Sequence, residues 1–143
     1  MMKQQILLFA LTVLLSTSVY SQNQKQNQNK SQSTQFDFQR SIGLDKHTKL
    51  ETIDITIAEN TMHFDLKIET VVTSGKLTIE IYDSNDKNKG TFSVGTQLNT
   101  GYQEETLGNI TKSLLEPEPG NWKVKIIPIN ASGVVNIRTS TLL

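Results

Sequence analysis

The chain of 143 residues contains no cysteine, only two histidines and only three prolines. Without cysteine, the protein can form neither a disulfide framework nor a zinc site with thiolate ligands. Its acidic and basic residues balance at 14 each, which indicates neither nucleic acid nor an anionic membrane surface as a partner. An apolar core therefore has to stabilise the fold by itself.

Recognisable signatures of catalysis are also lacking. The sequence has no G-x-S-x-G nucleophile motif and no glycine-rich phosphate loop. The histidines, His47 and His63, are too few for a zinc site without cysteine. We expect neither a catalytic site nor a metal site, and the sequence favours a protein that is not an enzyme.

The first 21 residues have the layout of a secretory signal peptide. A basic start at Met1–Lys3 precedes an apolar run from Ile6 to Leu15, and small residues follow up to Ser21. The apolar run is too short for a membrane anchor, which needs about 20 apolar residues. We predict cleavage near Ser21, export to the periplasm or the outside of a bacterial cell, and no membrane span in the mature protein.

A polar segment, residues 22–35, comes next. Nine of its fourteen residues are glutamine or asparagine, and none is a large apolar residue. A segment that buries nothing cannot offset the entropy lost on ordering. We predict a disordered linker at 22–35, which separates the signal peptide at 1–21 from a folded domain at 36–143.

From residue 36 onward, apolar and polar residues alternate with a period of two. The pattern covers residues 36–44, 50–57, 61–69 and 75–83, with polar connections at 58–60, 73–75 and 83–90. Alternation of this kind predicts half-buried antiparallel strands. Residues 91–113 contain several glycines and predict one or two short or edge strands. The fold class expected is all-β, an antiparallel, jelly-roll-like β-sandwich of about 7–9 strands.

The C-terminal region predicts a hairpin that closes this domain. A strand beginning at Trp122 alternates as far as Pro128, which predicts an edge or a bend there because proline cannot donate to a ladder. The segment NASG at 130–133 then predicts a turn before a last strand. Trp122 falls in the apolar alternation, so we interpret it as a core residue rather than as a platform for a sugar.

This region resembles the end of the bacterial pre-peptidase C-terminal domains and related jelly-roll modules of secreted proteins. The resemblance implies an accessory domain that assists binding, targeting or solubility. It depends on these residues: Pro119, Gly120, Trp122, Val124, Ile126, Gly133, Val135 and Ile137.

One loop has the composition of a binding site. Residues 83–90 contain Asp83, Asn85, Asp86 and Asn88, whose oxygens at near-alternate positions suit calcium, which takes six to eight oxygen ligands. The lysines in the loop and the lack of a following bidentate glutamate favour an ordinary hairpin loop instead. Calcium is therefore only a weak alternative, and no other cofactor is predicted.

Three functional hypotheses remain open. The first is an exported, non-catalytic module that binds a protein or glycan partner at the cell envelope. The second is a small envelope hydrolase built on His63 with Asp65 and a loop carboxylate, Glu104 or Glu105. The third is a structural protein that assembles through its edge strands.

Overall fold

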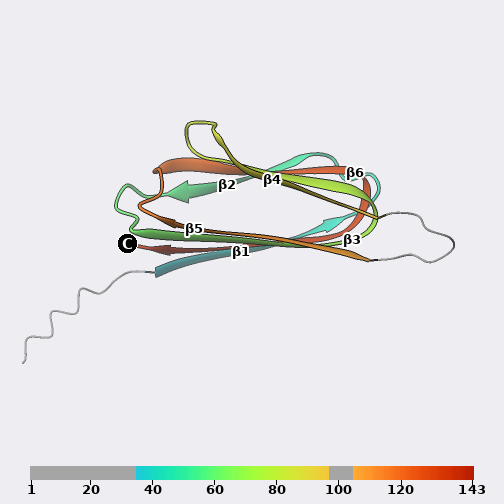
Figure 1. The fold of residues 1–143 in the computed structure, drawn as a ribbon, viewed down its shortest axis with the longest axis horizontal. Helices are drawn as coiled ribbons and strands as arrows, with labels where there is room; N and C mark the ends of the chain where they lie inside the picture. The colour runs from blue at the N-terminus through green and yellow to red at the C-terminus, as the bar shows by residue number, and fades with distance from the viewer. Residues whose placement is uncertain (1–34, 97–104) are drawn as a thin grey trace, which may run out of the picture. The chain divides into compact units, whose positions relative to one another are not determined.

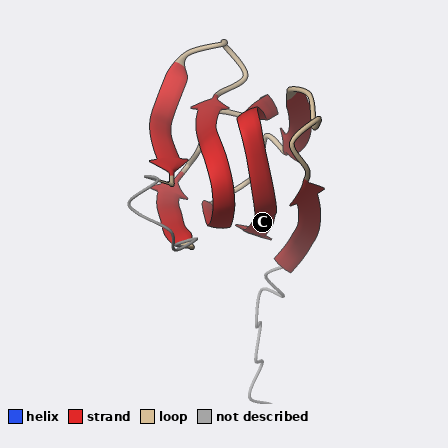
Figure 2. Ribbon diagram, turned by 90° about the vertical axis from the view of Figure 1, so that its right-hand side faces the viewer, coloured by secondary structure: helices blue, strands red, loops and turns tan. Residues whose placement is uncertain are grey.

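The computed structural model describes residues 35–96 and 105–143. The predicted signal peptide and the predicted linker lie outside these residues, apart from Gln35, which is the first residue of a strand. Every regular element in the described part of the chain is a β-strand (Figure 2).

Six strands make up the domain, and all their pairings are antiparallel. The observed class is therefore the predicted all-β antiparallel one. The strand bounds are β1 Gln35–Leu44, β2 Glu51–Ile57, β3 His63–Tyr82, β4 Asn88–Gly95, β5 Thr106–Leu115 and β6 Gly120–Leu142.

Two long strands, β3 and β6, connect the two layers of the sandwich. They have 20 and 23 residues and pair with each other over most of their length. The first half of β3 and the second half of β6 lie between β5 and β1 and form a first layer. Their other halves lie between β4 and β2 and form a second layer. Figure 1 shows the two layers one above the other, with β3 and β6 passing from one to the other.

Glycine allows the two long strands to bend together. Gly75 and Gly133 have φ angles of +74° and +147°, and the β3–β6 register shifts between Val72 and Lys76. A Cβ on Gly133 would lie 2.0 Å from the carbonyl oxygen of Val71, and one on Gly75 would lie 2.2 Å from that of Asn130. Only glycine lets the two backbones pass this closely at the corner.

The turns predicted at 73–75 and 130–133 are therefore wrong, and so is the terminal hairpin. Both segments lie inside continuous strands, where they form the bend between the layers. The described residues contain six strands rather than the predicted 7–9, because β3 and β6 each supply a segment to both layers. Glycine and polar residues mark a change of direction in either case, and the sequence does not distinguish a bend from a turn.

Pro128 lies at this bend, as predicted. It pairs with Leu77 on one side, while the strand on the other side, β2, ends its pairing at Ile126. β6 is central in each layer, but at Pro128 one of its sides lacks a neighbour among the described strands. A missing N–H is tolerated at such a position.

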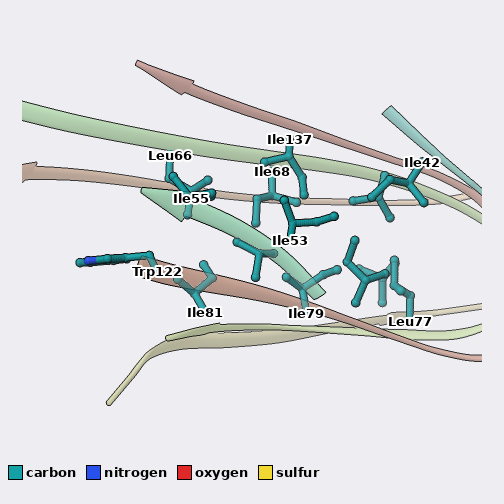
Figure 3. Close-up of a cluster of buried hydrophobic side chains, with 14 of the residues drawn as sticks. Ile42, Ile53, Ile55, Leu66, Ile68, Leu77, Ile79, Ile81, Trp122 and Ile137 are labelled. Carbon is teal, nitrogen blue, oxygen red and sulfur yellow. The ribbon is translucent and has the colours of Figure 1, made fainter. Parts of the chain in front are cut away.

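The core fills the space between the two layers. Aliphatic side chains from both layers meet there, as Figure 3 shows for Ile53 and Ile79 of the second layer and Ile68 and Ile137 of the first. Trp122 is 1% exposed, and its Nε1 donates to the carbonyl oxygen of Glu118 at 2.8 Å. The prediction that Trp122 is a core residue is confirmed.

Candidate interaction surface

The two long sides of the sandwich differ. On one side, the edge strands β4 and β5 approach each other across the layers. On the other side, no Cα atom of β1 lies within 8 Å of a Cα atom of β2. We call this second side, between β1 and β2, the open side.

The start of β1 presents aromatic side chains at the open side. Phe36 pairs with Thr141 of β6, and Phe38 pairs with Thr139. Both belong to the same alternating set of β1 as Ile42, which pairs with the buried Val135. Directly opposite residues share a sheet face, so both rings lie on the inward face of the first layer. They are nevertheless 57% and 40% exposed. No facing strand covers them in the described part of the chain.

The corresponding residues on the other side of the sandwich are covered. Phe92 of β4 and Ile110 and Leu114 of β5 are inward-facing residues of edge strands, and all three pack against the core. The difference lies in whether a second layer reaches over the strand.

The outer edge of β1 carries unpaired backbone groups. Within the described residues, β1 pairs only with β6, over its whole length from Gln35 to Leu44. An exposed strand edge can accept another strand through its N–H and C=O groups. Apolar side chains beside such an edge add a hydrophobic contact to this backbone recognition.

One charge interrupts the apolar series of β1. Arg40 pairs with the buried Ile137, so it also lies on the inward face, and its guanidinium forms an ion pair with Glu51 at the start of β2. The two side chains are 48% and 31% exposed. This ion pair joins the layers at the open side, and inward-pointing charge is one way in which edge strands limit indiscriminate pairing.

The predicted loop site at 83–90 spans the β3–β4 connection, residues 83–87, and the first three residues of β4. Asp83 is 3% exposed, and its Oδ1 accepts hydrogen bonds from the backbone N–H groups of Asn85 and Lys87, each at 3.0 Å. The ammonium of Lys89 lies 3.6 Å from Asp83 Oδ2. Burial raises the pKa of Asp83, but the backbone donors and Lys89 outweigh it and hold the pKa below its ordinary value.

The other three predicted ligands have hydrogen-bonding partners of their own. Asp86 accepts a hydrogen bond from Lys123 at 2.8 Å, and Asn88 Oδ1 accepts one from the N–H of Gly90 at 2.9 Å. The Asn85 amide donates to Glu118. The described residues contain no group of three or more acidic or histidine side chains placed to hold a metal ion. This geometry organises a hairpin turn.

His63 lies at the start of β3 with both polar partners on one ring nitrogen. Its Nε2 is 3.0 Å from Asp65 Oδ2 and 3.2 Å from Ser113 Oγ on β5. A serine–histidine–aspartate triad uses opposite ring nitrogens for the base and the orienting contact. The observed contacts on a single nitrogen do not have that arrangement, and the side chain of His63 is 32% exposed on the outer sheet face.

The loop carboxylate Glu105, predicted to act with His63, lies far from it. Glu105 precedes Thr106, which pairs with Val72, nine residues along β3 from His63. At about 3.3 Å per residue this separation is roughly 30 Å. Glu104 lies outside the described residues.

The alternation over residues 36–44 predicts a strand with one apolar face, which includes Phe36 and Phe38, but it does not show that these two rings are uncovered. Two signals were present. The residues just before Phe36 are polar, and Arg40 interrupts the apolar series of β1. A charge in an inward series indicates that the strand is not fully enclosed.

Comparisons with known proteins concern the fold alone. No family model and no curated protein matches the chain, so the resemblance to pre-peptidase C-terminal domains stays a prediction. The described residues contain no helix of the length and apolarity needed to cross a membrane.

Several solved bacterial structures are similar to part or all of the domain. Dimeric latent PorU from Porphyromonas gingivalis matches 76% of this chain at 8% identity and a TM-score of 0.49, and the chain spans 13% of the length of PorU. A disulfide-linked pilus protein of Bacillus endospore appendages matches 78% at 13% identity and a TM-score of 0.39, over 88% of its own length. A cycloisomaltooligosaccharide glucanotransferase from a Paenibacillus species matches 76% at 14% identity and a TM-score of 0.32, over 18% of its length.

Proposed function

We propose that this protein is an exported, non-catalytic interaction module that binds its partner by strand addition to β1. The observation that carries the proposal is the pair of inward-facing, exposed rings of Phe36 and Phe38 beside an unpaired strand edge. A partner strand placed against β1 gains backbone hydrogen bonds and covers both rings. Fully burying one phenylalanine stabilises such a complex by about 1.5–3 kcal/mol.

Several features support a protein partner over a flat carbohydrate platform. The only tryptophan, Trp122, is buried, and the exposed aromatic rings lie inside the open side rather than across an outer sheet face. The edge of β1 offers a row of main-chain donors and acceptors, which matches an extended polypeptide.

Photo-crosslinking in the producing cells tests this proposal. A photoreactive phenylalanine analogue at Phe38 is compared with the same analogue at Leu107, a 75% exposed apolar residue on β5. We expect a defined adduct from position 38 and none from position 107. Equal adducts from both positions, or none from either, would contradict the proposal, and mass spectrometry identifies the partner in any adduct.

Export is the second part of the proposal and needs its own test. The basic start, the short apolar run and the small residues near Ser21 support cleavage by a signal peptidase. We expect the protein to be recovered from the periplasm or the medium with an N-terminus near residue 22. Recovery from the cytoplasm with Met1 retained would contradict export.

A further inference from the structure

We infer that the partner of β1 is β1 of a second copy of this chain, paired antiparallel about a twofold axis at Gln39. The inference rests on the proposed function and specifies its partner. Antiparallel pairing of one strand with itself satisfies the same unpaired edge on both copies and leaves no edge of β1 free. The two first layers then join into a single sheet.

The side chains of β1 are complementary in this register. With Gln39 opposite its own copy, Phe38 lies opposite Arg40 of the second copy, and Phe36 lies opposite Ile42. All four residues belong to the inward set of β1, so these contacts form on the face where both rings are now exposed. An arginine beside an aromatic ring and a ring beside an aliphatic side chain are both favourable pairs.

Alternative registers are poorer. A shift by one residue in either strand places the inward set of one copy opposite the outward set of the other. Centring the pair on Arg40 sets two arginines directly opposite each other, which is unfavourable. Centring it on Phe38 shortens the paired segment to 35–41, whereas centring on Gln39 pairs residues 35–43. Arg40 thus selects the register.

The outward set of β1 presents no conflict. In the Gln39 register, Asp37 lies opposite Ser41 of the second copy and Gln35 lies opposite Gly43. No pair along the segment places like charges opposite each other.

The absence of cysteine makes the register directly testable in the purified protein. Directly opposite residues of an antiparallel pair have Cα atoms about 4.5–5.5 Å apart, within the range that a disulfide spans. We expect Gln39→Cys to form a disulfide-linked dimer on mild oxidation. Ser41→Cys is the matched control, because the cysteines at position 41 of the two chains would be four residues apart along the strands, roughly 14 Å. A mixture of Asp37→Cys and Ser41→Cys protein should form a linked heterodimer.

Sedimentation equilibrium supplies an independent measurement. We expect a concentration-dependent dimer, and the double variant Phe36→Ser/Phe38→Ser should raise its dissociation constant by about tenfold or more. Leu107→Ser, which changes an exposed residue of β5, should leave it unchanged. Circular dichroism checks that each variant keeps its strands.

Three results would overturn the inference. They are a monomer at all concentrations, equal crosslinking at positions 39 and 41, and larger open-ended species, which would indicate pairing of β1 with a different edge. A monomer whose photoreactive residue at position 38 crosslinks to another protein would overturn the inference but leave the proposed function standing. A monomer with no adduct at position 38 would overturn both.

Discussion

On the side where β4 and β5 run, the two layers of the sandwich meet, and the inward residues of both edge strands pack against the core. On the side where β1 and β2 run, the layers stay apart, and the inward rings at the start of β1, Phe36 and Phe38, are exposed, while the later inward residues Ile42 and Leu44 are buried. The alternation of apolar and polar residues in β1 is at least as regular as that in β5, where Lys112 faces inward and Leu107 is 75% exposed. Period-two alternation therefore decides which way a side chain points, while the opposite layer decides whether it is buried.

Truncating one phenylalanine on β3 and one on β1 should give the largest difference in the free energy of unfolding. Phe64 is fully buried, with its ring 5.6 Å from that of Trp122, whereas Phe36 is 57% exposed at the open side. We expect Phe64→Ala to lower the free energy of unfolding by about 3–5 kcal/mol. Phe36→Ala should lower it by about 1 kcal/mol or less. Urea denaturation measures both, and comparable losses would show that β1 is covered in solution by the chain itself.

Adding a methyl group to Gly108, which faces the core, and to Gly43, which faces outward from β1, separates crowding inside the sandwich from the effect of the backbone alone. A Cβ on Gly108 of β5 would lie 2.3 Å from Val94 Cγ2, while a Cβ on Gly43 of β1 would have no atom within 4 Å. We expect Gly108→Ala to destabilise the fold by about 1–3 kcal/mol through overpacking. Gly43→Ala should stabilise it by about 0.4–1 kcal/mol, because it restricts the unfolded chain. Thermal unfolding of the two variants measures both effects, and a loss of stability at Gly43 would contradict the empty surroundings of this outward position.

The β3–β4 turn next to the closed side should show a pH dependence. The pKa of Asp83 lies below the ordinary value of 3.8, so folding favours its ionised form. The ionised carboxylate stabilises the fold at any pH above the ordinary pKa of 3.8, and this stabilisation is lost as the pH falls through the lowered pKa of the folded state. We expect Asp83→Asn to lower the urea midpoint at pH 7, with a difference from the wild type that shrinks toward pH 2. A difference that stays constant over this range would contradict the role of the carboxylate charge.

The ion pair across the open side should make the smallest contribution to the stability of the fold. Arg40 and Glu51 are both partly exposed, and pairs of this kind contribute about 0–1 kcal/mol. A double-mutant cycle with Arg40→Gln and Glu51→Gln should give a coupling energy in this range that decreases as salt is added. A coupling that is larger and insensitive to salt would indicate that the two layers are held together more tightly at this side than the structure suggests.

Particular residues show how far the sequence could predict the site. The alternation placed Phe36 and Phe38 on the inward face correctly, and it placed Trp122 in the core. It could not reveal that both rings stay uncovered, because the distance between β1 and β2 across the layers does not follow from their being consecutive in the sequence. The loop at 83–90 was singled out for its oxygens, yet its geometry directs them to the loop's own N–H groups and to lysines.

The sequence by itself determined the strands, the direction of their side chains and most of the core, because these follow from local alternation and from the length of each apolar run. Only the tertiary structure decided that Gly75 and Gly133 bend two continuous strands instead of ending four short ones. It also decided that one side of the sandwich is closed and the other open. The physical reason is that bending and burial depend on contacts between residues far apart in the chain, such as Gly133 against Val71 and Gly108 against Val94. The alternation of one segment contains no information about its neighbour across the layers.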